Sequence, residues 1–223
     1  MELYLSCRSV HSLPEKEDEL VALIEDLPFG HEEAQRLLRI THTDTLRQSL
    51  CGKLALWRLL RDRGLPPPYP ILRSETGKPF FESPDLPAFS ISHSETLALA
   101  VLSDRPHLPI GADLQFMDPR RNTKRLSDHY FTPREQEEYA AAEDPNAYFF
   151  RRFTQKEAIA KQSGEGLSMI IKQKTENTGL YLQTLLLRHK GKTAYVSLAT
   201  PEEITILHFI DSEKELSYDR LSH

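Results

Sequence analysis

The strongest constraint on the fold of this chain is a helical periodicity that covers residues 43–63. Apolar side chains recur there at every third or fourth position: Leu46, Leu50, Leu54, Trp57 and Leu60. This spacing predicts an amphipathic helix that Thr43 or Asp44 can cap. Gly64 follows, and the segment "LPPPYP" cannot continue the helix because proline lacks the N–H donor. The helix is therefore expected to end at about residue 63.

Runs of apolar or alternating residues predict strands on both sides of this helix. "LYLSCRSV" (3–10) alternates, and "ALAVLS" (98–103) has the composition of a buried strand. A turn at "DRPHLP" (104–109) leads into a further strand at "IGADLQF" (110–116). A charged segment from Pro14 is expected to form another helix.

Two more helices are predicted in the second half of the chain. Thr132 and Glu135 have the spacing of a capping box, with Pro133 at the first helical position. This pattern predicts a helix from Pro133 to about Ala142. A second helix is expected from about Pro145 to Ser163.

The last third of the sequence changes to strand-like patterns. Apolar runs at 179–190, 193–200 and 203–210 are separated by short polar turns and predict a meander of strands. The polar residues from about 211 to 223 are expected to form a loose tail. The fold class is therefore α+β, with an N-terminal half over 1–106 and a C-terminal half over 107–223.

Composition excludes several classes of function. The 223 residues carry a formal net charge of −5, which argues against general nucleic-acid binding, although "DPRRNTKR" (118–125) is a local basic run or simply a solvated segment. No apolar stretch approaches the ~18 residues needed to span a bilayer, and the N-terminus lacks the pattern of a signal peptide. Two cysteines cannot form a disulfide framework, so a cytoplasmic location is expected.

The helix over 145–163 raises a question about one carboxylate. At ~100° per residue, a single arc holds Phe149, Phe153, Glu157 and Ala160. The opposite side, expected to face water, holds Arg151, Gln155 and Gln162. An inward carboxylate is costly unless a cation meets it. A pair between Glu157 and Lys161 at i,i+4 is the simple explanation, but it does not explain the inward direction.

A second carboxylate lies on the strand over 110–116. Period-2 geometry places Gly111, Asp113 and Gln115 on one face, where the glycine leaves room for a ligand. A solvated polar face is the alternative. If Asp113 and Glu157 converge, they suit Mg²⁺, which takes oxygen ligands from carboxylates, phosphates and water.

Three further segments offer donors or cations for phosphate. "FSISHSE" (89–95) places Ser92 and His93 before a buried strand, where they could bind phosphate, form a hydrolase pair or only a turn. Lys78 lies in a glycine–proline turn, where an inert surface lysine is the alternative. Arg47 lies near the start of the long helix, where the helix dipole favours an anion. Together with two acids, these groups suit a polyphosphate ester.

These residues resemble the Sfp-type 4′-phosphopantetheinyl transferases. The resemblance covers most of the chain from about Leu27, and its motifs appear in the order of the family: "GKP" (77–79), "FSISHS" (89–94), "IGADLQ" (110–115), "HYFTPREQEEY" (129–139) and "FTQKEAIAKQSGEGLS" (153–168). The family moves the phosphopantetheine arm of coenzyme A to a serine of an apo carrier protein and releases 3′,5′-ADP with Mg²⁺. The resemblance implies a pseudo-dimer of two similar α+β halves with the active site in the cleft between them.

The resemblance also implies a role for each matching residue. Asp113 and Glu157 correspond to metal ligands, with Gln115 as a doubtful third, and Glu157 and Lys161 to catalytic groups. Matching contacts to coenzyme A are Arg47, Lys78, Ser92, His93, Lys156 and Lys161. The implied partner is an acyl or peptidyl carrier protein of lysine, fatty-acid, polyketide or nonribosomal peptide synthesis. A pseudo-dimer has little need for a second chain, so a monomer is expected, with no nucleic acid or membrane as partner.

The sequence departs from the family pattern at several positions. Gln115 stands where a glutamate is frequent, which predicts weaker metal affinity, and Phe153 stands where tryptophan is usual. Glu32 and Gln35 replace basic residues for the 3′-phosphate, which Arg36 and Arg39 could supply. Two other functions stay open: a non-catalytic coenzyme A- or nucleotide-binding protein, and a magnesium-dependent phosphoesterase.

Overall fold

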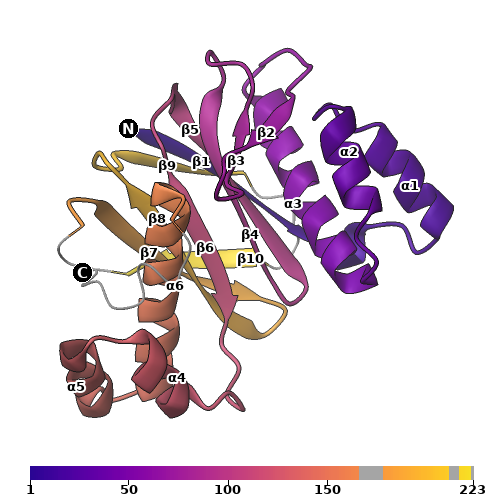
Figure 1. Cartoon of the computed structure of the whole chain (residues 1–223). Coiled ribbons are helices and arrows are strands. Elements are labelled where there is room, and N and C mark those ends of the chain that lie inside the picture. Colours follow the sequence, from indigo (N-terminus) through magenta and orange to yellow (C-terminus); the bar gives the residue numbers. More distant parts are fainter. Residues whose placement is uncertain (166–177, 211–215, 222–223) are drawn as a thin grey trace. The chain divides into compact units, whose positions relative to one another are not determined.

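The computed structural model describes residues 1–165, 178–210 and 216–221, which form a mixed α+β architecture as predicted (Figure 1). No helix in these residues is both long enough and apolar enough to cross a membrane. The chain divides into two compact units, each with its own sheet and one long helix. The first unit comprises Met1–Pro109 and Ile204–Lys214, and the second comprises Ile110–Glu203 and Glu215–His223.

The first unit contains a four-stranded sheet in the order β4-β5-β1-β9. The strands are β1 (Glu2–Ser9), β4 (Pro87–Ser94), β5 (Leu97–Pro106) and β9 (Ile206–Ile210). β5 pairs antiparallel with both β1 and β4, whereas β9 lies parallel to β1. A separate hairpin consists of β2 (Ile71–Arg73) and β3 (Pro79–Phe81).

Helix α3 (Thr43–Asp62) packs across β1, β4 and β5, and its predicted extent is confirmed. The residue at its N-cap is His42, not Thr43 or Asp44. The apolar stripe of α3 is buried in the main core of this unit. The remaining helical segments are a short 3₁₀ turn (Val10–Ser12), α1 (Glu17–Glu25) and α2 (His31–Leu38).

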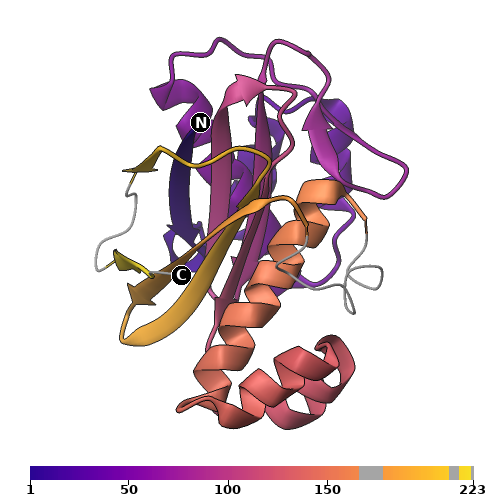
Figure 2. The ribbon, with the colours of Figure 1, turned by 90° about the vertical axis from the view of Figure 1, so that its left-hand side faces the viewer.

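The second unit contains an antiparallel sheet in the order β10-β7-β8-β6. The strands are β6 (Gly111–Phe116), β7 (Tyr181–His189), β8 (Lys192–Thr200) and β10 (Leu216–Arg220). Three helices complete the unit: α4 (Thr123–Tyr130), α5 (Pro133–Ala141) and α6 (Pro145–Ser163). Helix α6 lies along the sheet, with the two shorter helices near its N-terminal end (Figure 2).

Local sequence signals set the ends of the two helices that matter most for the site. Thr132 and Glu135 form the predicted capping box of α5, with Pro133 in the first turn. The side chain of Asp144 caps α6, and Gly164 ends it with a positive φ of 78°. Because a left-handed residue with no Cβ costs little strain, glycine suits this position.

Two expectations for the C-terminal third are wrong. The third apolar run does not continue the meander, because β9 joins the sheet of the first unit and pairs in parallel with β1. Within the supposed loose tail, Leu216–Arg220 form β10, which pairs with β7 through its backbone although four of its five residues are exposed. The rest of that tail, 211–215 and 222–223, lies outside the described residues.

Candidate functional site

Gly111 allows helix α6 to approach strand β6 more closely than any other residue would. A Cβ atom built on Gly111 would lie 1.9 Å from the backbone oxygen of Ala158 and 2.5 Å from the nitrogen of Gln162. The space beside this glycine is therefore filled by the helix and is not left for a ligand, which corrects the prediction from sequence. The close approach places the next residue on the same strand face, Asp113, beneath the helix.

Asp113, Glu157 and Lys161 come together between β6 and α6. The Lys161 Nζ lies 2.8 Å from the Asp113 Oδ1, so the lysine pairs with the strand. Only 6% of Asp113 is exposed, and Glu157 is half-buried one turn before the lysine. Burial and the charge of Asp113 raise the pKa of Glu157, while Lys161 opposes them. Two carboxylates from distant positions therefore share one electrostatic environment.

A row of polar side chains continues from Asp113 across the sheet. Asp113 lies opposite Ser197, and Ser197 lies opposite Thr184 in the strand register. The Thr154 Oγ1 lies 2.9 Å from the Ser197 Oγ, and Gln155 donates to the Thr184 Oγ1 over 3.0 Å. Gln155 is therefore buried against the sheet, and its predicted exposure to water is wrong. The row fixes how α6 lies on the sheet, because buried polar groups need their partners.

Gln115 lies on the same strand face, two residues beyond Asp113. Its side chain is half-buried, and its register partner is Tyr195 on β8. An amide oxygen at this position is able to act as a neutral ligand, but it adds no negative charge to the two carboxylates.

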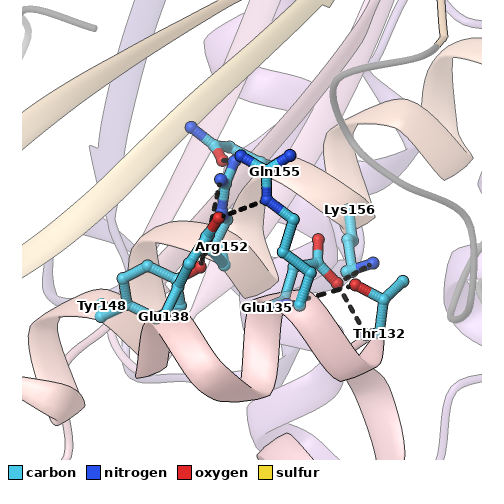
Figure 3. Close-up of polar contacts among 8 residues, drawn as sticks. Thr132, Glu135, Glu138, Tyr148, Arg152, Gln155 and Lys156 are labelled. Atoms are coloured by element: carbon cyan, nitrogen blue, oxygen red, sulfur yellow. Dashed lines mark hydrogen bonds and ion pairs between the residues drawn. The ribbon is translucent and has the colours of Figure 1, made fainter. Parts of the chain in front are cut away.

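Lys156 points away from this site and into the protein. It is completely buried, and its Nζ lies 2.9 Å from the Glu135 Oε2 on α5 (Figure 3). The same oxygen accepts a hydrogen bond from the backbone of Thr132 over 2.8 Å. Burial lowers the pKa of Lys156, and Glu135 opposes this shift. The structure therefore gives Lys156 a carboxylate partner within the protein.

In the first unit, the candidates for coenzyme contacts lie on three elements. Ser92 and His93 are consecutive on β4, so their side chains alternate: the serine is buried and the histidine is exposed. Lys78 lies in the turn between β2 and β3, where burial lowers its pKa to about 8.

The side chain of Arg47 on α3 donates hydrogen bonds to the backbone. Its guanidinium donates to the carbonyl oxygens of Pro14, Val10 and Leu13 at 2.8, 3.1 and 3.3 Å. The arginine also lines a cavity of about 420 Å³, in which Asp44 and Glu95 are the acidic residues. These three bonds attach the segment before α1 to the long helix.

A larger cavity in the same unit was not predicted. It has a volume of about 700 Å³ and lies between α2 and the β2–β3 hairpin. Its lining includes the two arginines named from sequence as substitutes, Arg36 and Arg39, and also Glu32 and Gln35. Arg73, from β2, is a third arginine at this cavity.

At the wall of this cavity, one largely buried carboxylate meets three cations. Glu33, which is 3% exposed, accepts from Arg36 at 2.8 Å, from Lys53 at 3.1 Å and from Arg73 at 3.2 Å. Burial opposes the ionised form of Glu33, but these partners outweigh it and lower its pKa to about 2. The cluster has an excess of two positive charges. The i,i+3 spacing of Glu33 and Arg36 was a local signal, whereas Lys53 sits on the apolar face of α3 and gave none.

Comparison with known proteins identifies the family of this chain. A model of the 4′-phosphopantetheinyl transferase superfamily matches residues 109–198, which include Asp113, Glu157 and Lys161. The 4′-phosphopantetheinyl transferase AcpT of Escherichia coli K12 is 31% identical over 163 residues, which are 70% of this chain and 80% of that protein. The chain belongs to this superfamily.

Other transferases match shorter or more divergent parts. The 4′-phosphopantetheinyl transferase AcpT of Salmonella typhimurium is 37% identical over 117 residues, which are 51% of this chain and only 59% of that relative's length. A 4′-phosphopantetheinyl transferase of Bacillus subtilis is 27% identical over 159 residues, which are 69% of this chain and 66% of that protein.

The residues between β6 and α6 include two carboxylates, which are ligands that suit a hard divalent cation. No group of three or more His, Cys, Asp and Glu side chains suited to a metal occurs in the described parts of the chain. Burial and the nearby Asp113 nevertheless raise the pKa of Glu157, and a cation beside Glu157 would favour its ionised form. Mg²⁺ commonly uses one or two protein carboxylates and completes its shell with phosphates and water.

The basic run at 118–125 is exposed and partly paired. Arg120 contacts Asp118 at 3.1 Å, and Lys124 pairs with Asp128 on α4. Arg121 and Arg125 are exposed beside them. The segment follows β6 directly, so it lies close in sequence to the strand that holds Asp113.

Proposed function

We propose that this protein transfers the 4′-phosphopantetheine arm of coenzyme A to a serine hydroxyl of an apo acyl or peptidyl carrier protein, with release of 3′,5′-ADP. Family membership supports this activity. The observation that supports it most directly is the meeting of Asp113, Glu157 and Lys161 within the segment that matches the family model. Phosphoryl transfer needs positive charge and a proton acceptor around a diphosphate, and these side chains supply both.

We assign metal binding, charge stabilisation and proton transfer to the residues of this group. Asp113 and Glu157 would hold Mg²⁺, and Gln115 would contribute an amide oxygen directly or through water. The ion, when bound, supplies positive charge against the charge that develops on the phosphate. Lys161 stabilises the same charge. Glu157 accepts the proton of the carrier serine, directly or through water. Because the nucleophile belongs to the partner, the protein needs no activated serine or cysteine.

The first unit contributes the proposed contacts to the rest of coenzyme A. Lys78, Ser92 and His93 bind phosphate, and a phosphate beside Lys78 would favour its charged form. For the 3′-phosphate we favour Arg36 and Arg39, because they line a cavity with excess positive charge. The Arg47 guanidinium is already used by three carbonyl groups.

The two units are proposed to be halves of a pseudo-dimer. Each contains a four-stranded sheet covered by one long helix, α3 in the first and α6 in the second. Each helix also meets its sheet at a glycine, Gly52 on α3 and Gly111 on β6. These common features support a shared ancestry of the halves.

The exposed basic run is proposed to dock an acidic carrier protein. Reversal of two charges, Arg121→Glu with Arg125→Glu, should raise the KM for the carrier about tenfold and leave the KM for coenzyme A unchanged. The matched control is Lys16→Glu with Arg61→Glu, which changes the net charge equally at exposed positions of the first unit. A control that raises the carrier KM as much as the test variant would reject the docking role.

One assay separates the proposed function from its alternatives. The protein is incubated with coenzyme A, Mg²⁺ and a panel of apo carriers, and each carrier is weighed by mass spectrometry. A carrier that gains the mass of the phosphopantetheine arm supports transfer and identifies the class of partner. Formation of 3′,5′-ADP with an unmodified carrier indicates a phosphoesterase. Coenzyme A binding by calorimetry without turnover indicates a binding protein.

A further inference from the structure

We infer that the buried pair of Lys156 and Glu135 is a positioning device for Glu157, and that Lys156 does not contact coenzyme A. This inference rests on the proposed function, because it assigns Glu157 a role in the reaction. Lys156 and Glu157 are consecutive, so a fixed Lys156 limits the rotation of α6 at the residue that follows. The bond to Glu135 is the contact that fixes it.

The pair belongs to a rigid junction between α5 and α6. The Glu135 Oε2 accepts both the Lys156 ammonium and the backbone N–H of Thr132, at 2.9 and 2.8 Å. The Thr132 hydroxyl in turn accepts from the backbone N–H of Glu135 at 3.3 Å. The start of α5 is therefore closed by its capping box and attached to α6 by the same carboxylate (Figure 3).

Helix α6 is thus held from two sides around Glu157. On the sheet side, Gly111 touches its backbone at Ala158, and Thr154 bonds to Ser197. On the other side, Lys156 binds α5. A helix supported by only one of these contacts could roll on its neighbour. A carboxylate that must meet Asp113 and a substrate tolerates little of such movement.

Stability alone does not explain a charged pair at this place. Two ions lose hydration on burial, and a well-packed apolar pair of similar volume is frequently as stable or more stable. The directional bonds of the pair specify one arrangement of the two helices instead. Contact with a phosphate is also disfavoured, because the ligand would have to draw Lys156 away from Glu135 and leave that carboxylate buried without its cation.

The experiment compares Lys156→Met, Glu135→Gln and the double variant with the unaltered protein. Glutamine at 135 keeps an acceptor for the Thr132 N–H, and the double variant has no buried charge without a partner. Lys156→Met should lower kcat about tenfold, as removal of a supporting residue typically does, with the coenzyme A dissociation constant by calorimetry unchanged. The double variant should recover most of kcat.

A matched control tests the other contact between the same two helices. Tyr148 on α6 donates to Glu138 on α5, at 2.5 Å, and Arg152 binds that carboxylate at 3.3 Å. Tyr148→Phe breaks part of this network and leaves Lys156 in place (Figure 3). It should lower the melting temperature without lowering kcat at a temperature where every variant is folded.

Mn²⁺ binding provides a readout that does not depend on turnover. Titration of Mn²⁺ in the presence of coenzyme A should show an affinity about tenfold lower in Lys156→Met than in Tyr148→Phe. Equal Mn²⁺ affinities in these two variants, or a coenzyme A affinity that falls tenfold in Lys156→Met, would overturn the inference. Absence of transfer by the unaltered protein on every carrier would instead reject the proposed function, and the Mn²⁺ comparison would still decide the role of the pair.

Discussion

At the scale of single residues, the fold disfavours ionisation of one buried carboxylate and favours ionisation of another. The protein raises the cost of ionising Glu157 by burying it next to Asp113, whereas it strongly favours the ionised form of Glu33 by surrounding it with three cations. A carboxylate that is unfavourable for folding is typical of a functional site, and one that is favourable is typical of a structural or binding cluster. We therefore expect neutralising substitutions at these two residues to have opposite effects on stability.

Glu157→Gln should separate activity from stability. The raised pKa means that the folded state disfavours the charged carboxylate, so a neutral amide should leave the free energy of unfolding equal or higher. The same change removes the proposed proton acceptor and metal ligand, and kcat should fall by roughly 10²–10⁴. Single-turnover transfer and urea unfolding check both halves of this prediction. Full transfer activity in the variant would remove Glu157 from the mechanism.

Glu33 should control stability in acid. Its pKa is about 2 in the folded protein and 4.5 when unperturbed, so its contribution is complete above pH 4.5 and is lost as the pH falls toward 2. Glu33→Gln should therefore lower the free energy of unfolding at pH 7 by on the order of 3 kcal/mol. Between pH 4.5 and pH 2 the difference from the unaltered protein should shrink. A difference that stays constant across this range would contradict the role of the cluster.

At the scale of elements, the site depends on how closely a helix and a strand approach. Most of these elements were predictable, because periodicity and capping residues act locally: α3, α5 and α6 begin or end where Gly64, Thr132 and Gly164 indicate. Contacts across elements were not predictable. The buried face of α6 extends beyond its apolar stripe, because Gln155 is buried and bonds to Thr184, which lies 29 residues away.

The candidate site shows the same division between local and long-range information. Motif resemblance identified Asp113, Glu157 and Lys161, and the structure brings these three together. The partners of Lys156 and Arg47 could not be derived, because burial of a lysine or an arginine is decided by residues elsewhere in the chain. Glu135 was recognised only as part of a helix cap, although its carboxylate also binds Lys156.

Gly111→Ala should damage the site through the helix backbone. The new methyl group would lie 1.9 Å from the Ala158 oxygen, so α6 must move away from β6. We expect a loss of about 1–3 kcal/mol in the free energy of unfolding and a clear fall in kcat. Denaturant unfolding and the transfer assay measure the two effects.

Gly52→Ala is the control for this prediction. Its methyl group would meet the Ile91 Cγ2 at 2.6 Å, which is a side-chain atom and not backbone, and alanine favours the helix by up to ~1 kcal/mol. The change should therefore cost less stability than Gly111→Ala and leave kcat unchanged. Equal losses in the two alanine variants would show that the backbone contact at Gly111 has no special importance.

At the scale of the whole molecule, consecutive strands near the C-terminus belong to different units. β9 belongs to the sheet of the first unit and β10 to that of the second, although both follow β8 in sequence. A parallel pair with β1 needs a long connection, and local patterns do not reveal such a pairing, which is why a continuous meander was predicted. Neither unit corresponds to one uninterrupted stretch of the chain.

Truncation after Glu203 should therefore destabilise both units. The first unit would lose β9, which leaves the edge of β1 unpaired, and the second would lose β10 beside β7. We expect a lower melting temperature and concentration-dependent aggregation, measured by calorimetry and light scattering. The control is a milder truncation after residue 221, which keeps β9 and β10 and should behave like the unaltered protein.

The position of β9 also has a consequence during synthesis on the ribosome. Strand β1 leaves the ribosome long before its parallel neighbour, Ile206–Ile210, is translated. Until then the nascent N-terminal sheet exposes an open edge, the kind of surface on which chains aggregate. Chaperone protection during translation should matter more for this protein than for one whose N-terminal half closes its own sheet.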